Sequence, residues 1–262
     1  MSLTRDQVIQ KRGDLSQFLI HLTRTGLLTL RKDIHPHLTQ DLIVNSTAHE
    51  RLKNLLAAKK IIAFSPLGYF QHKVPFAYPN GYVHNKNSNV VRSWLKAACF
   101  TEPPPPLDHI YIQTQPITER NLHFESYGLA FKEEFIRQQG GSPVMYFEST
   151  NQLVKSALDA MIISQDSVKF KTMMPFYEAF GARLYGQGSD VDFRWEREWR
   201  CLDDISFDFS DVAFGICKDV DRPFFSNLIG NAFPFIEPPS NPQQVHQVKM
   251  YLRSFSHLSN LK

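Results

Sequence analysis

The order of strand-like and helix-like segments constrains the fold of this 262-residue chain most. Apolar runs short enough for strands cluster at residues 97–147 and 193–218, and segments with helical periodicity dominate the front and middle. Strict alternation of strand and helix is absent, which argues against a doubly wound parallel sheet. The pattern therefore predicts an α+β fold, taken as one domain over residues 1–262 with a core at about 14–220 and a C-terminal helical extension at 241–262.

Capping patterns mark three helix starts. Thr47 and Glu50 form a capping box before a helix over residues 51–60, and Ser149 with Gln152 forms another. Asn241-Pro242 opens the last helix, because Asn caps well and Pro suits the first turn. The apolar faces expected on these three helices comprise Leu52, Leu55 and Leu56; Leu153, Ala157, Leu158, Met161 and Ile162; and Val245, Val248 and Leu252.

Further segments complete the expected outline. Residues 15–23 form an apolar-rich opening segment that ends in His21-Leu22-Thr23. A strand is predicted at 97–102, where Pro103 ends it because proline donates no ladder hydrogen bond. Residues 65–93 are predicted to form a long loop, and residues 172–185 a helix interrupted by proline. The remaining predicted strands are 61–64, 127–131, 143–147, 193–202, 205–209 and 212–218.

Composition excludes several classes of protein. Hydrophobic residues make up 42% of the chain, which excludes a mainly disordered protein. The formal charge, 29 − 26 = +3, is too small for a general nucleic-acid coat. The sequence contains no apolar run of about 18 residues and no secretory signal at its start. Three cysteines without a CxxC pair predict reduced, buried thiols and a cytoplasmic protein.

Charge is unevenly distributed along the chain. Residues 1–60 carry ten Lys or Arg against five acids, and residues 190–211 carry eight acids against three Arg. The two segments either pack against each other or form the two electrostatic sides of a cleft.

The segment Arg194–Arg200 contains the sharpest candidate for chemistry. On a strand, alternation places Glu196 and Glu198 on one face with Arg194 and Arg200. Two such carboxylates can divide the work of binding a substrate and moving a proton. The alternative is a charged ladder paired with a neighbouring strand, with the tryptophans in the core.

Two other segments carry weaker signals. His21 and Thr23 share a strand face and could hydrogen-bond an amide and a ribose hydroxyl, although a lone His is more often structural. Phe100 and Glu102 share a face at a predicted strand end. The histidines show no metal-ligand spacing, so no metal site is predicted.

Several blocks occur in one order and together resemble the AbiGi-type abortive-infection (phage resistance) proteins of bacteria. The resemblance spans roughly residues 14–220. The blocks that carry it are Phe18–Arg24, Leu52–Ile61, Cys99–Pro103, Tyr127–Glu133, Gly141–Tyr146 and Trp195–Arg200.

The same layout is similar, more remotely, to ADP-ribosyltransferases of the DarT kind. That resemblance implies a split, mainly antiparallel sheet that grips NAD, a substrate, in a central cleft. It implies that His21 and Thr23 hold the nicotinamide end, and that a late strand carries the catalytic glutamate, Glu198 or Glu196. Arg24 or Arg92 would bind the phosphates, and Phe100, Tyr127 or Phe131 would stack on the ring.

Three functions remain open on the sequence. The first is an NAD-dependent ADP-ribosyltransferase that acts in anti-phage defence on a nucleic-acid base, a protein side chain or water. The second is a non-catalytic, antitoxin-like partner of a toxin in a defence module, which the AbiGi resemblance also implies. The third is a nucleic-acid-acting protein that uses the basic front half.

Overall fold

The fold is taken from a computed structural model of the whole chain. It describes residues 16–30, 42–63, 96–103, 110–111, 114, 124–163, 172–181 and 194–259. The predicted loop at 65–93, with Arg92, lies outside these residues.

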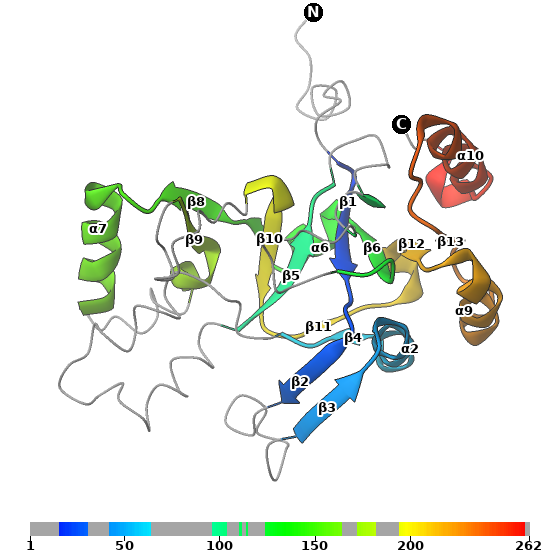
Figure 1. Cartoon of the computed structure of the whole chain (residues 1–262), viewed down its shortest axis with the longest axis horizontal. Coiled ribbons are helices and arrows are strands. Elements are labelled where there is room, and N and C mark those ends of the chain that lie inside the picture. Colours follow the sequence, from blue (N-terminus) through cyan, green and yellow to red (C-terminus); the bar gives the residue numbers. More distant parts are fainter. Residues whose placement is uncertain are drawn as a thin grey trace, which may run out of the picture.

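A mostly antiparallel sheet forms the centre of the molecule (Figure 1), which confirms the predicted α+β class. Among the described residues, only its β12–β13 pair is parallel. The seven strands follow the spatial order β13 (Phe235–Ile236), β12 (Val212–Ile216), β6 (Gly128–Lys132), β1 (Phe18–Leu22), β5 (Ala97–Thr101), β10 (Glu198–Leu202) and β7 (Ser142–Pro143).

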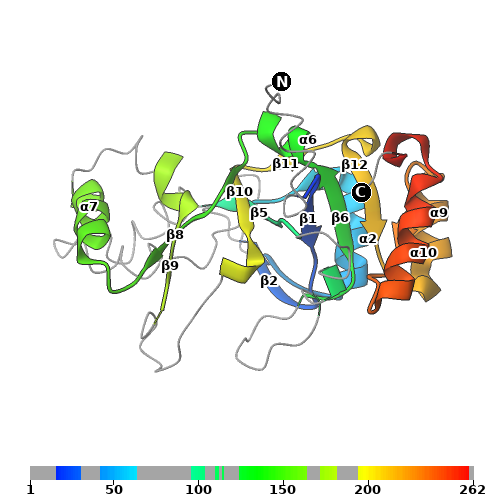
Figure 2. The ribbon, with the colours of Figure 1, turned by 90° about the horizontal axis from the view of Figure 1, so that it is seen from above.

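Three two-stranded sheets accompany the main sheet. The antiparallel pairs are β2 (Gly26–Leu30) with β3 (Leu42–Ser46) and β4 (Lys60–Ile61) with β11 (Ile205–Ser206); the parallel pair is β8 (Met145–Glu148) with β9 (Tyr177–Phe180). The β8–β9 pair lies with helix α7 (Gln152–Ile163) on the side of the sheet away from α9 (Arg222–Ile229) and α10 (Pro242–Arg253), as Figures 1 and 2 show. Helices α2 (Ala48–Ala58) and α6 (Glu133–Gln138) also lie in the described part of the chain.

Helix α2 forms as its sequence predicts. Thr47 caps it, and both hydrogen bonds of the capping box with Glu50 are present. Its buried face packs into a core cluster on one side of the sheet, to which β1 contributes Leu19. The neighbouring Ile20 belongs to a second cluster with Leu252 of α10, because successive strand residues point to opposite faces. The sheet is therefore covered on both faces.

Several predicted elements are corrected by the structure. The segment predicted as a helix over 172–185 is helical at 172–173 and then forms a 3₁₀ turn, Met174–Phe176, followed by strand β9, while 182–185 lie outside the described residues. Asn151, rather than Ser149, caps α7, and its side chain accepts a hydrogen bond from Val154 N. Leu153 is 85% exposed and Ala157 is exposed, so two residues of the predicted inward face of α7 point outward, while Leu158 is buried.

Candidate functional site

The main sheet opens between β1 and β5. These strands share one residue pair, Ile20 with Thr101, whereas β1–β6 and β5–β10 each pair over five residues. Beyond that pair, the His21 ring reaches across the opening, and its Nδ1 lies 2.9 Å from the carbonyl oxygen of Cys99. Because a carbonyl only accepts, Nδ1 donates and Nε2 is left as an acceptor. Burial lowers the pKa of His21 below its ordinary value, so the ring is neutral at pH 7.

A cavity of about 120 Å³ lies at this opening. It brings together four of the residues predicted from the sequence: His21, Phe100, Glu196 and Glu198. The imidazole and the Glu198 carboxylate come from strands 177 positions apart in the chain, β1 and β10. The full lining is Ile20, His21, Leu22, Cys99, Phe100, Thr101, Phe124, Glu196 and Glu198.

Glu198 is fixed by a buried guanidinium two residues further along β10. Arg200 donates from Nε to Oε1 of Glu198 at 2.9 Å and from Nη2 to Oε2 at 2.7 Å, a two-point contact. The Arg200 side chain is 3% exposed and that of Glu198 12%. Burial alone would lower the pKa of Arg200, but the carboxylates beside it, Glu198 first, raise it well above its ordinary value. Glu198 and Arg200 thus share one face of β10, as strand alternation predicted.

Glu196 reaches the cavity by a different route from the one predicted. The strand predicted over 193–202 is wrong at its start, because Arg194–Glu196 form a 3₁₀ turn and β10 begins only at Glu198. Between them Arg197 takes a left-handed conformation with φ of 45°. Strand alternation therefore does not relate the two glutamates. Instead, the Thr101 hydroxyl donates to the Glu196 carbonyl oxygen and holds the turn against β5.

Glu102 holds the left-handed turn from the other side. Its carboxylate accepts hydrogen bonds from Arg197 Nη2 at 2.8 Å and from the Trp199 indole at 3.1 Å. The backbone N–H of Ser16 donates to the same carboxylate. Glu102 is thus a structural anchor that ties the start of β10 to β5 and to the entry of β1.

Four predicted cofactor-binding residues do not line this cavity. Thr23 is buried, and its hydroxyl lies 2.9 Å from the carbonyl oxygen of Ala48 and 3.1 Å from that of Tyr127. The Tyr127 hydroxyl donates to Asp221 at 2.6 Å.

Phe131 and Arg24 also lie elsewhere. Phe131 has no exposed surface and packs in the core against Phe100, Phe135 and Phe207. Arg24 is partly buried, which lowers its pKa from the ordinary value. Among the four, the structure gives Thr23, Tyr127 and Phe131 structural contacts.

The three cysteines are all described, and each is a free thiol. Burial raises the pKa of Cys201 and of Cys217 to about 12. Burial, and next the Glu198 carboxylate, raise the pKa of Cys99 well above its ordinary value. Cys99 therefore lines the cavity as a neutral thiol rather than as a nucleophile.

Three residues of the site were missed by the sequence analysis. Phe124 lines the cavity from a segment without a predicted strand or helix. Glu178 accepts a hydrogen bond from Arg200 Nη2 at 3.0 Å, and it lies on β9, in a segment predicted as a helix. The Tyr146 hydroxyl lies 3.4 Å from Glu198 N. For Glu178, the signal in the sequence was Arg200 within a predicted strand, because an arginine buried in a sheet requires acidic partners.

The basic and acidic segments of the chain meet at the surface. Lys60 pairs with Asp204 at 2.8 Å and Lys59 with Asp208 at 3.5 Å. These contacts agree with the packing interpretation for the part of residues 1–60 that the structure describes.

Comparison with family models, with curated proteins and with solved structures finds no match to this chain. Within the described residues, no helix has both the length and the apolar character that a membrane span requires. The same residues contain no group of three or more His, Cys, Asp or Glu arranged to hold a metal ion.

Proposed function

We propose that this protein is an NAD-dependent ADP-ribosyltransferase that acts in bacterial defence against phage. One observation carries the proposal: His21 of β1 and Glu198 of β10 line the same cavity at the opening of the sheet. The DarT resemblance implies an early strand with a His-x-Thr and a late strand with a glutamate around one NAD site. The opening between β1 and β5 supports a split sheet of that kind.

The residues of the cavity fit one end of NAD. A volume of about 120 Å³ is well below the roughly 300–1,000 Å³ of pockets for drug-sized ligands, so it suits one ring rather than a whole dinucleotide. Phe100 and Phe124 give the ring apolar walls. Because Nδ1 of His21 donates to the Cys99 carbonyl oxygen, Nε2 can accept a hydrogen bond. An amide N–H or a ribose hydroxyl of the nicotinamide end can donate one to it.

Glu198 has the position and the support for the catalytic role. Cleavage of the bond between nicotinamide and ribose builds positive charge on the ribose, as in glycoside hydrolysis. A carboxylate fixed in advance stabilises that charge best. The two-point contact with Arg200 fixes Glu198 in this way and leaves further lone pairs of its oxygens to accept a ribose hydroxyl.

Glu196 would act on the acceptor. It enters the cavity from the 3₁₀ turn rather than from β10, so its carboxylate approaches from a different element than that of Glu198. A second carboxylate at the cavity can orient or deprotonate the group that receives ADP-ribose. The acceptor could be a nucleic-acid base, a protein side chain or water.

The test is nicotinamide release by the purified Glu198→Gln variant. We expect at least a hundredfold loss, because Gln keeps the shape of the side chain and removes the charge. The control is Glu148→Gln, which changes an exposed carboxylate on β8 and should release nicotinamide at the wild-type rate. Wild-type turnover by the folded Glu198→Gln variant would show that the catalytic assignment is wrong.

The wild-type protein provides the broader test. Nicotinamide release in the presence of DNA, RNA or a cell extract supports the transferase. No release under any of these conditions contradicts it. In that case, co-purification with the product of a neighbouring gene would support the antitoxin-like alternative, and salt-dependent binding of DNA or RNA would support the nucleic-acid alternative.

A further inference from the structure

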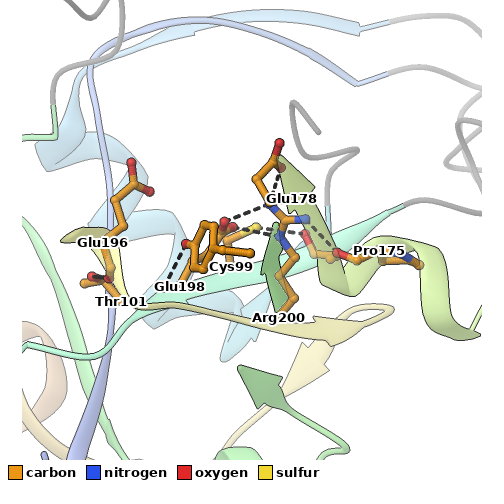
Figure 3. A network of polar contacts seen from close by, with 9 residues as sticks. Cys99, Thr101, Pro175, Glu178, Glu196, Glu198 and Arg200 are labelled. Atoms are coloured by element: carbon orange, nitrogen blue, oxygen red, sulfur yellow. Dashed lines mark hydrogen bonds and ion pairs between the residues drawn. The ribbon is translucent and has the colours of Figure 1, made fainter. Parts of the chain in front are cut away.

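Arg200 joins the main sheet to the small β8–β9 sheet. Besides its two hydrogen bonds to Glu198, it donates from Nη2 to Glu178 at 3.0 Å and from Nη1 to the carbonyl oxygen of Pro175 at 2.6 Å. Glu178 belongs to β9, and Pro175 to the 3₁₀ turn before it. Figure 3 shows the guanidinium between Glu198 on one side and Glu178 and Pro175 on the other.

This contact crosses between sheets that share no ladder in the described residues. The β8–β9 pair is a separate two-stranded sheet, and the chain reaches it from edge strand β7 through Val144. Arg200 and Glu178 are 2% and 1% exposed, so their contact is sealed from water. An ion pair buried to this degree persists only when its geometry is well satisfied.

We propose that Glu178 is a positioning residue for Glu198, which it holds in place through Arg200, and that the β8–β9 sheet thereby regulates the site. The inference rests on the proposed function, because it assigns a control over the catalytic carboxylate. Glu178 itself is not among the residues that line the cavity. It acts by sharing the Nη2 group that also binds Oε2 of Glu198.

The charges around Glu178 make this control dependent on pH. Among the described residues it faces Arg200 and Glu198 from β10 and Tyr146 from β8, and Cys99 of β5 lies against the same guanidinium. Burial raises the pKa of Glu178 to about 7, although Arg200 opposes the shift. Burial also raises the pKa of Tyr146 and of Cys99, so both are neutral there. Glu178 thus gains a charge near pH 7 and then binds Arg200 more strongly, which holds the guanidinium in place against Glu198.

The decisive experiment compares the pH profile of nicotinamide release in the wild type, Glu178→Gln and Glu148→Gln. We expect the wild-type kcat to rise as the pH increases through about 7, where Glu178 becomes charged. Glu178→Gln should lack this rise, because Gln keeps an acceptor for Arg200 but does not titrate. Its kcat should fall by about ten- to hundredfold at pH 8, with KM within about twofold. Glu148→Gln, on the other strand of the same small sheet, should keep the wild-type rise and rate.

Two outcomes would overturn the inference. The first is a Glu178→Gln profile identical to that of the wild type. The second is seen in protein stability, which tests the inference even if the wild type releases no nicotinamide and the proposed function fails on its own. The shared guanidinium is then tested by the urea midpoints of Glu178→Gln, Glu198→Gln and the double variant, for which we expect non-additive shifts. Additive shifts would show that Arg200 does not couple the two carboxylates.

Discussion

The two sides of the cavity are held by different kinds of interaction. On the β1 side, His21 lies on the same strand as Leu19 and Ile20. These two residues are buried in core clusters on opposite faces of the sheet. One hydrogen bond to a backbone carbonyl fixes its ring. On the β10 side, Glu198 is held by a buried guanidinium that also binds a carboxylate from a separate sheet.

This contrast predicts different responses to substitution. The position of His21 follows from strand pairing and apolar burial, which are shared among many residues. The position of Glu198 depends on one side chain, that of Arg200. Its charge compensates the carboxylates of Glu178 and Glu198, which are 1% and 12% exposed. Removing a partner from a buried ion pair costs more than losing one contact, because the remaining charge stays buried.

The largest expected effect comes from Arg200→Met. Met keeps much of the side-chain volume and removes the charge, which leaves Glu178 and Glu198 buried without their cation. We expect the free energy of unfolding in urea to fall by about 3–5 kcal/mol. If that variant does not fold, the triple variant Glu178→Gln, Glu198→Gln, Arg200→Met should recover stability, because it buries no charge.

A surface pair provides the control for this prediction. Arg222 pairs with Asp219, and their side chains are 37% and 61% exposed. Arg222→Met should therefore cost less than about 1 kcal/mol. Equal losses for Arg200→Met and Arg222→Met would show that burial does not make the ion pairs of Arg200 more costly to break than an exposed pair.

The β1 side was largely predictable from the sequence. The sequence marked the opening segment as apolar, and the DarT resemblance implied a strand at His21 and Thr23. The Thr47–Glu50 capping box indicated helix α2, which covers that strand. Both signals are local, since they depend on residues within one turn or one strand. The role of Thr23 was less predictable, because its hydroxyl bonds to carbonyls of Ala48 and Tyr127 that are distant in sequence.

The β10 side was predictable only in part. Strand alternation placed Glu198 and Arg200 on one face, but it could not locate the start of the strand. That start depends on Glu102, which binds Arg197 and Trp199 from more than 90 positions away. Glu178 escaped prediction for a related reason: Pro175 interrupts a helix-like pattern, and tertiary contacts with Arg200 accompany the strand that forms instead.

The next effect concerns pH and stability. Burial raises the pKa of Glu178 from 4.5 to about 7 in the folded protein, so between these values the folded state holds a proton that the unfolded state has lost. The free energy of unfolding should therefore fall as pH rises from about 4.5 to 7, by at most about 3 kcal/mol, with no further change from this group above 7. Urea unfolding at a series of pH values measures it.

Paired variants isolate this contribution. Glu178→Gln has no proton to exchange at this position, so its free energy of unfolding should lack that decline between pH 4.5 and 7. Glu148 is exposed, and Glu148→Gln should keep the decline. A decline of equal size in Glu178→Gln and in the wild type would mean that another group is responsible.

The smallest expected effect tests the β1 side through its close packing against β6. Gly128 pairs with Leu22, and a Cβ added there would lie 2.4 Å from the carbonyl oxygen of His21. Gly128→Ala should therefore push the strands apart, lower the free energy of unfolding by about 1–3 kcal/mol and shift the NMR signals of the His21 ring. In the control Gly230→Ala the added methyl meets no atom within 4 Å, so strain from its φ of 64° should reduce stability without moving those signals. Unchanged His21 signals in Gly128→Ala would show that strand packing does not set the position of the ring.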